Sequence, residues 1–251
     1  ARAKMHALEA FAEAEKIDLA LCTGDYTALG TEPESELARD AVEGFTKLPL
    51  GFVSVAGNHD IYVDAARREG AYDRHFGAFG TTEMPEHASP EGYPFVRFFG
   101  DDLAIVGVVS VRPNDAFHKS SGRVPETQLR ALDAILCDPK LAKRFVIIAT
   151  HYAPRLWDGR PDTALHGLEN ADALLAVAKG VPWGAIVHGH VHHCYHVRVP
   201  GLDASLFCAG SATYEGREGA WVYDVTAKGV RATPVAFLGE RYVLRSEERI
   251  E

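Results

Sequence analysis

The sequence predicts an α/β fold, a four-layer α/β/β/α sandwich of two mixed β-sheets flanked by helices. Two observations predict it. Over the first two thirds of the chain, short apolar, β-branched runs alternate with segments of helical periodicity, which is typical of layered α/β folds. The last third instead contains short strand-like runs joined by turns, which indicates further strands packing on the first sheet.

Five helices are predicted. The first covers residues 1–18, where Met5, Leu8 and Phe11 recur at three- and four-residue spacing. Pro125 stands where a first-turn proline belongs, ahead of another periodic segment. The remaining helices are expected at roughly residues 34–47, 64–76, 125–137 and 168–179.

Four apolar runs end abruptly in Gly or Thr followed by a side chain that can bind a metal. They occupy residues 18–25, 51–60, 145–151 and 184–193. Apolar runs of about four to eight residues bounded by turn residues are typical of strands buried on both faces. Because functional groups gather beyond the carboxyl ends of such strands, we expect these four ends to converge on one edge of the sheet.

The C-terminal third is expected to supply an antiparallel or mixed second sheet. Its strand-like runs cover residues 196–201, 204–212, 219–230 and 231–239. No internal repeat, low-complexity tract or linker divides the chain. A chain of 251 residues fits one large core better than two small ones, so we expect a single domain over residues 1–251.

Composition excludes some classes of function. A net charge of -9 and a pI near 5.7 argue against a general nucleic-acid or membrane-surface binder, so an anionic substrate would need local positive charge such as metal ions. The chain has neither a signal peptide pattern nor a spanning run of about 20 apolar residues, and a cytoplasmic location is expected. The four cysteines lack metal-site spacing, and most are expected to be small buried hydrophobes. The oligomeric state stays open.

The predicted strand ends carry a mixed nitrogen and oxygen ligand set: Asp25, Asn58, His151, His190 and His192. A carboxylate can bridge two cations, and mixed sites of this kind suit zinc, manganese or iron better than calcium. Taken alone, a strand histidine is more often a core or surface residue, and an aspartate after glycine more often forms a turn. Chance does not explain all of these side chains at four separate strand ends.

In order and spacing these blocks resemble the calcineurin-like metallophosphoesterase family. The matching residues are GD at 24–25, GNHD at 57–60, His151 and GHVH at 189–192, with a helix start like the family's at 121–136. The residues within these blocks look most like those of bacterial cyclic-nucleotide-type phosphodiesterases. The resemblance implies a binuclear centre of manganese, iron or zinc and hydrolysis of a small phosphorylated substrate, with a phosphodiester favoured.

The same resemblance implies a role for each residue. Asp25 would bridge both metals, the second metal would be held by Asn58, His151 and His190, and His192 would belong to the first. Two cations about 3.5–4 Å apart lower the pKa of a bridging water to give a hydroxide, and they clamp the phosphoryl oxygens for in-line attack. His59 would be the general acid for the leaving group, with Asp60 orienting its ring.

Part of the family pattern is missing from the printed chain. The pattern opens with Asp-x-His at the end of a first strand, whereas this chain begins inside the helix that should follow. We expect that strand, with the rest of the first metal site, to lie upstream of residue 1. Three alternatives stay open: a phosphomonoesterase or nucleotidase, a protein phosphatase on the same site, and a non-catalytic binding scaffold with an incomplete metal site.

No residue is assigned firmly to substrate binding. His118, Arg123 and His193 are weak candidates: a solvated loop is the favoured explanation for the first two, and plain surface explains His193 as simply as a pocket rim does. His188 is expected to pack or to form hydrogen bonds, not to bind metal, and His166 is undecided. Substrate choice would depend on loops without a recognisable motif, around residues 77–95, 111–124 and 153–168.

Overall fold

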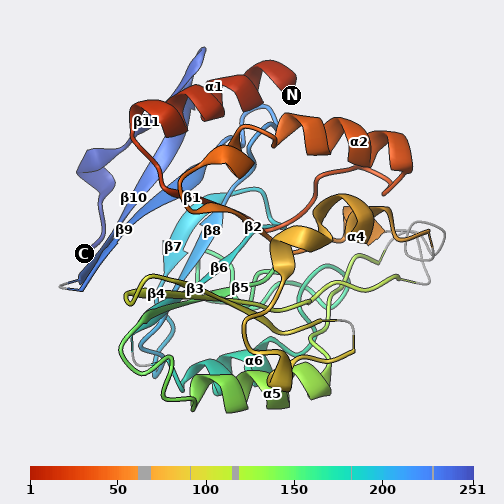
Figure 1. Ribbon diagram of the computed structural model, residues 1–251, viewed down its shortest axis with the longest axis vertical. Coiled ribbons are helices and arrows are strands. Elements are labelled where there is room, and N and C mark those ends of the chain that lie inside the picture. The colour runs from red at the N-terminus through yellow and green to blue at the C-terminus, as the bar shows by residue number, and fades with distance from the viewer. Residues whose placement is uncertain (62–68, 91, 115–118, 182, 228) are drawn as a thin grey trace.

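The computed structural model describes residues 1–251 apart from 62–68, 91, 115–118, 182 and 228. Its elements stack in four layers (Figure 1). Helices α5 (Glu126–Leu136) and α6 (Ala171–Ala178) pack together on one face of a six-stranded sheet. Two smaller sheets lie on the other face, and α1 (Arg2–Ala14) and α2 (Glu32–Ala41) form the outermost layer there. The predicted α/β fold class is confirmed.

The six-stranded sheet is mixed and has the order β3-β4-β5-β6-β8-β7. Strands β4, β5, β6 and β8 run parallel, and the two edge strands are antiparallel to their neighbours. The strands are β3 (Phe95–Phe99), β4 (Leu103–Gly107), β5 (Phe145–Ala149), β6 (Gly184–His188), β7 (Cys194–Val197) and β8 (Ser205–Ala209).

The second layer consists of two sheets, and one of them contains the first two predicted strands, which were expected in the first sheet. Strands β1 (Leu19–Cys22) and β2 (Gly51–Ser54) form a parallel pair. Strands β9 (Ala220–Thr226), β10 (Gly229–Leu238) and β11 (Arg241–Leu244) form an antiparallel sheet. Neither sheet is mixed on its own, and the first two C-terminal strands, β7 and β8, join the large sheet instead of this layer.

An apolar core holds the two sheet layers together. It contains buried side chains from both sides, among them Val53 of β2, Phe95 of β3, Ile147 of β5, Phe207 of β8 and Ala232 of β10. Burying each large apolar side chain contributes roughly 1.5–3 kcal/mol, so this interface fixes how the strand ends face one another.

The helices largely follow the predicted periodicity. The segments predicted at 1–18, 125–137 and 168–179 are found as α1, α5 and α6. The segment at 34–47 is broken: α2 stops at Ala41, and a 3-10 turn follows at Phe45–Lys47. For the segment at 64–76, residues 64–68 lie outside the described residues, and α4 covers Ala71–Phe76. Further 3-10 turns lie at His59–Ile61, Gly77–Gly80, Pro85–His87 and Ser246–Glu248.

Two further expectations need correction. Strand β5 is buried at every position as predicted, but β1 is only half-buried, because within the described residues it pairs with a strand, β2, along one edge alone. The predicted ligands therefore converge from two sheets and not from one edge of one sheet. Of the cysteines, only Cys208 is buried; Cys22 is half-buried, and Cys137 and Cys194 are exposed.

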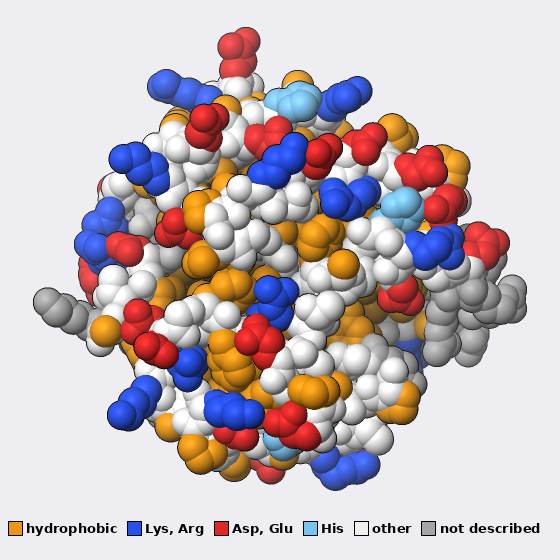
Figure 2. All heavy atoms as spheres, in the orientation of Figure 1, with side chains coloured by type: hydrophobic (Ala, Val, Ile, Leu, Met, Phe, Trp, Pro, Cys, Tyr) orange, Lys and Arg blue, Asp and Glu red, His pale blue; other side chains and the backbone are white. Residues whose placement is uncertain are grey.

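The molecular surface carries both signs of charge. On the face shown in Figure 2, basic and acidic side chains alternate between apolar areas, with no continuous basic surface in that view. Among the helices that the structure describes, none combines the length and apolar character needed to cross a bilayer.

Candidate metal centre

The turns after β1 and β2 pack back to back, and glycine makes this possible. A Cβ on Gly24 would lie 2.2 Å from the backbone nitrogen of Gly57, and one on Gly57 would lie 2.2 Å from the nitrogen of Asp25. Asp25 itself has a φ of 63°, in the left-handed region that costs a non-glycine residue about 1–2 kcal/mol. The close approach brings Asp25 beside Asn58 and His59.

The loop after β6 contains the same kind of strained backbone. His190 and His192 have φ values of 68° and 51°. Positive φ at non-glycine residues is uncommon and clusters at functional sites, where surrounding structure must hold it. Three of the five predicted ligands therefore adopt a backbone conformation that is uncommon outside glycine.

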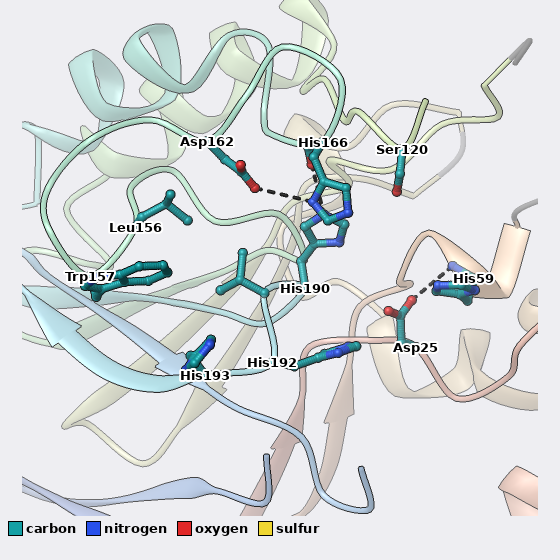
Figure 3. Close-up of a pocket in the computed structure, with 11 residues that line it drawn as sticks. Asp25, His59, Ser120, Leu156, Trp157, Asp162, His166, His190, His192 and His193 are labelled. Atoms are coloured by element: carbon teal, nitrogen blue, oxygen red, sulfur yellow. Dashed lines mark hydrogen bonds and ion pairs between the residues drawn. The ribbon is translucent and has the colours of Figure 1, made fainter. Parts of the chain in front are cut away.

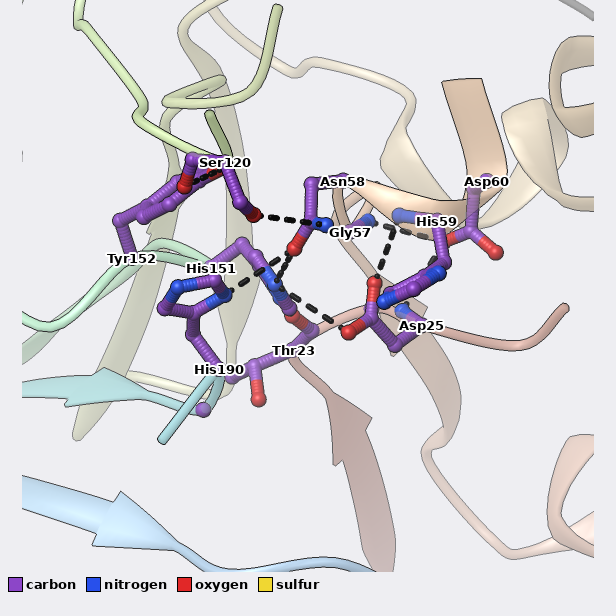
Figure 4. Close-up of polar contacts among 12 residues, drawn as sticks. Thr23, Asp25, Gly57, Asn58, His59, Asp60, Ser120, His151, Tyr152 and His190 are labelled. Atoms are coloured by element: carbon purple, nitrogen blue, oxygen red, sulfur yellow. Dashed lines mark hydrogen bonds and ion pairs between the residues drawn. The ribbon is translucent and has the colours of Figure 1, made fainter. Parts of the chain in front are cut away.

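Four predicted ligands meet across the space between the sheets (Figure 4). Asn58 Oδ1 lies 2.9 Å from His151 Nε2 and 3.0 Å from His190 Nδ1. Asp25 Oδ2 lies 3.4 Å from the same His151 nitrogen. The side chains of Asn58, His151 and His190 are buried, so bulk water does not separate these atoms.

Backbone carbonyls determine where the two imidazoles hold their hydrogens. His151 Nδ1 lies 2.7 Å from the carbonyl oxygen of Thr23, and His190 Nε2 lies 2.9 Å from that of His166. A carbonyl oxygen can only accept, so these nitrogens donate, and in a neutral ring the other nitrogen carries a lone pair. Burial, followed by the neighbouring rings of His151 and His166, lowers the pKa of His190 to about 2 and keeps that ring neutral.

With both rings neutral, the converging atoms are all hydrogen-bond acceptors. Two nitrogen lone pairs face the amide oxygen of Asn58, whose Nδ2 donates to Ser120 Oγ at 3.3 Å. The carboxylate of Asp25 adds negative charge at the same point. Buried acceptors that face one another are unfavourable unless a cation lies among them, and imidazole nitrogen with carboxylate and amide oxygen is a donor set that divalent metals accept. These residues fit a metal ion.

Asp60 links the two ligand-bearing turns by hydrogen bonds. Its Oδ2 accepts backbone N–H groups of Gly57 at 2.8 Å and Asp25 at 3.0 Å, and its Oδ1 accepts those of Tyr26 and Thr27 and the Thr27 hydroxyl. The side chain thus joins the turn after β1 to the turn after β2. Burial, reinforced by the nearby charge of Asp25, raises the pKa of Asp60 to about 6.

This network predicts a large stability loss for Asp60→Asn. The amide keeps one acceptor oxygen, but its NH₂ group faces two backbone donors that then have no partner. Each buried unsatisfied donor costs roughly 1–3 kcal/mol, so we expect the free energy of unfolding to fall by about 2–6 kcal/mol in urea titrations. The exposed Asp172→Asn is the matched control and should change it by less than about 0.5 kcal/mol. Equal stability of the two variants would contradict the linking role.

His59 lies at the edge of this cluster. Its backbone N–H donates to Asp25 Oδ1 at 3.0 Å, and its ring Nδ1 lies 2.9 Å from the carbonyl oxygen of Ala28. The family resemblance implied that Asp60 would hold the ring of His59. At Nδ1, the hydrogen-bond partner is the carbonyl oxygen of Ala28. With Nδ1 donating, Nε2 is the atom that can exchange a proton with a ligand.

The cluster opens into a cavity of about 400 Å³ (Figure 3). Asp25, His59 and His192 lie toward one end, and Leu156 and Trp157 toward the other. His192 is not linked by a described hydrogen bond to the other predicted ligands, but it lines the cavity next to Asp25. The remaining lining residues are Ser120, Asp162, His166, His190, Val191 and His193.

Comparison with known proteins agrees with this geometry. A model of the family described as calcineurin-like phosphoesterase matches residues 2–194, a range that contains all five predicted ligands. The chain belongs to the calcineurin-like phosphoesterase family. It is accordingly a phosphoric ester hydrolase, and the family is binuclear and metal-dependent. No curated protein resembles the chain closely enough in sequence to count as a match.

Solved structures show the same fold at low sequence identity. A dimetal phosphatase from Danio rerio is 15% identical with a TM-score of 0.64, and the alignment covers 97% of this chain and 85% of that one. The protein TT1561 of Thermus thermophilus is 14% identical with a TM-score of 0.52 and 91% coverage of both chains. GAP50, the anchor in the inner membrane complex of Plasmodium, is 12% identical with a TM-score of 0.50 and covers 93% and 76%.

The residues proposed only weakly for substrate binding in this phosphoesterase differ in their positions. His118 lies outside the described residues, and Arg123 is exposed and paired with Glu126 at 3.0 Å. His193 lines the cavity beside Arg217. His188 is fully buried, and its ring packs edge-on against that of Tyr195 with the centroids 5.7 Å apart, which agrees with a packing role.

Sequence reasoning missed several lining residues of the phosphoesterase, above all Trp157 and Asp162, which lie in a loop with no motif. Asp162, His166 and His190 have ligand atoms within 4.8 Å of one another and form a second possible metal cluster. It shares His190 with the predicted set but offers three donor residues where four converge in that set, which makes it the weaker candidate.

Proposed function

We propose that this chain hydrolyses a phosphodiester in a metal-dependent reaction. The single observation that carries the proposal is the convergence of four potential ligand atoms: His151 Nε2, His190 Nδ1, Asn58 Oδ1 and Asp25 Oδ2. His192 would complete the ligands that this chain supplies. Metal ions bound there would provide a nucleophilic hydroxide near neutral pH and neutralise the charge of the phosphoryl oxygens.

The chain's own groups hold these ligands in a binding-competent state. The carbonyls of Thr23 and His166 accept from ring nitrogens of His151 and His190, which leaves the other nitrogen of each ring toward the cluster, and Ser120 Oγ accepts from the amide of Asn58. Such supporting contacts typically change metal affinity or activity by about 10- to 100-fold. Manganese, iron and zinc all suit this donor set.

His59 is proposed as the general acid. It lies beside Asp25 and lines the cavity. Its Nδ1 donates to Ala28, so a protonated ring can release the hydrogen of Nε2 to the departing oxygen. Asp60 supports this step indirectly, because it holds the turns that position Asp25 and His59.

Metal binding is the first test of the proposal. With Mn²⁺ at about 100 times its dissociation constant, we expect about 2.7 kcal/mol of stabilisation, or roughly 5–10 °C in Tm by calorimetry. Ca²⁺ at the same concentration is the control and should shift Tm far less, because it prefers shells made only of oxygen. Identical shifts with both ions would show unspecific binding at surface carboxylates.

Hydrolysis is the second part of the same test. The Mn²⁺-loaded protein should release p-nitrophenol from bis(p-nitrophenyl) phosphate and stop when a chelator removes the metal. Faster hydrolysis of p-nitrophenyl phosphate would identify a monoesterase. Bound metal without hydrolysis of either compound would support a binding scaffold and contradict the proposal.

A further inference from the structure

An exposed tryptophan lies at the end of the cavity that the metal cluster does not use. Trp157 is 56% exposed, although its indole is one of the largest apolar groups of the chain. It belongs to a tight turn in which the N–H of Leu156 donates to the carbonyl of Arg160 at 2.8 Å and the N–H of Gly159 to that of Leu156 at 2.9 Å. The turn therefore presents the ring at the cavity rim on an ordered backbone.

Other contacts fix the orientation of this ring. Its centroid lies 5.5 Å from the ring of His193 and 6.4 Å from that of Tyr195. The Tyr195 hydroxyl donates to the carbonyl of Arg155 at 2.7 Å, which ties the turn to β7. Trp157 is supported from one side and open on another, which is the arrangement of a stacking platform.

The cavity has two chemically different ends (Figure 3). Asp25 and His59 lie at one end, and Leu156 and Trp157 at the other, with His190 and His192 between them. A volume of about 400 Å³ lies within the range of roughly 300–1,000 Å³ that small-molecule sites occupy. The site therefore holds more of the substrate than its phosphoryl group.

The position of His59 determines which part of a diester lies at each end. In hydrolysis, a bond forms between water oxygen and phosphorus, the bond from phosphorus to the leaving oxygen breaks, and that oxygen takes a proton. His59 supplies this proton, so the leaving group lies at its end of the cavity. The substituent at the Trp157 end is then the one that stays on phosphorus, and a monoester has no such group.

We propose that this retained substituent is a nucleoside whose base stacks on Trp157. A supported indole that is open to water on one side suits a flat ring better than an alkyl chain, which would need enclosure. Base stacking on an aromatic side chain contributes about 1–3 kcal/mol and accepts every base. Ser120, Asp162 and His166 line the same cavity and offer hydrogen-bonding groups to a sugar or a base edge. This inference rests on the proposed diester hydrolysis.

Two diesters with one leaving group test the inference. The p-nitrophenyl ester of thymidine 5′-monophosphate and methyl p-nitrophenyl phosphate both release p-nitrophenol and differ only in the retained substituent. In the Mn²⁺-loaded protein, Trp157→Ala should lower kcat/KM for the thymidine ester about 5- to 150-fold and leave that for the methyl ester within about twofold. Trp157→Phe should keep most of the preference. Leu238→Ala, at an equally exposed apolar residue at the end of β10, should change neither substrate.

A binding measurement separates this inference from the proposed function. Thymidine 5′-monophosphate should quench tryptophan fluorescence in the wild type and not in Trp157→Phe, where Trp183 and Trp221 are unchanged. Quenching without hydrolysis of either diester would support the stacking site while contradicting the hydrolytic function. An equal loss on both diesters in Trp157→Ala, or quenching that survives in Trp157→Phe, would overturn the inference.

Discussion

Replacing Asp25 by asparagine is expected to remove metal binding and phosphoester hydrolysis together. The amide keeps an oxygen that can accept from the His59 N–H, but the negative charge 3.4 Å from His151 Nε2 is lost. Loss of a supporting contact to a ligand typically lowers metal affinity or activity by about 10- to 100-fold. Loss of this charged ligand itself should therefore lower metal affinity by more than about 100-fold. Metal content per chain and turnover of bis(p-nitrophenyl) phosphate give the two readouts.

Asp162→Asn is the informative comparison for this variant. It removes a carboxylate from the same cavity but from the alternative cluster with His166 and His190. We expect that protein to retain its metal. If Asp162→Asn loses the metal and Asp25→Asn keeps it, the alternative cluster is the metal site and the proposed ligand set is wrong.

His59→Ala is expected to give the second-largest effect, on turnover alone. Removing a positioned proton donor costs about 10²–10⁴ in rate when the leaving group is a strongly basic alkoxide. The loss should be far smaller with p-nitrophenolate, which departs without a proton. Turnover of a diester with each kind of leaving group measures this difference, and the metal content should stay near that of the wild type.

Two results would contradict this role of His59. An equal loss with both leaving groups would mean that the ring positions the substrate and does not donate a proton. Loss of metal along with turnover would place His59 among the ligands. His193→Ala, at another histidine that lines the cavity, is the control and should show no dependence on the leaving group.

The layered fold could be predicted because its signals are local. Each buried strand is an apolar run between turn residues, and the ligands follow directly after β1, β2, β5 and β6. The division of the second layer could not be predicted, because the parallel pairing of β1 with β2 joins residues as distant as Leu19 and Gly51, and neither strand's sequence specifies its partner. The antiparallel pair of β3 and β4 is a local hairpin, and it was not among the predicted strands.

The ligand types could likewise be predicted, but their protonation and support could not. The carbonyls that set the tautomers belong to Thr23 and His166, which are 128 and 24 residues away from the imidazoles they contact. The family resemblance implied that Asp60 orients His59; the hydrogen bonds that its carboxylate accepts from the turn after β1 could not be predicted, because that turn lies more than 30 residues away in the sequence. Trp157 gave no signal, because an exposed loop residue belongs to no periodic pattern.

The meeting of ligands from two sheets bears on when the site forms during folding. Asp25 and Asn58 follow strands of one layer, and His151 and His190 follow strands of the other. The cluster exists only after the layers have docked, and closing such distant contacts is slow because chain entropy is lost first. Interactions that form after the folding transition state lower the unfolding rate and leave the folding rate nearly unchanged. A bound metal would therefore mainly lower the unfolding rate. It would lengthen the lifetime of the folded enzyme and leave its folding rate nearly unchanged.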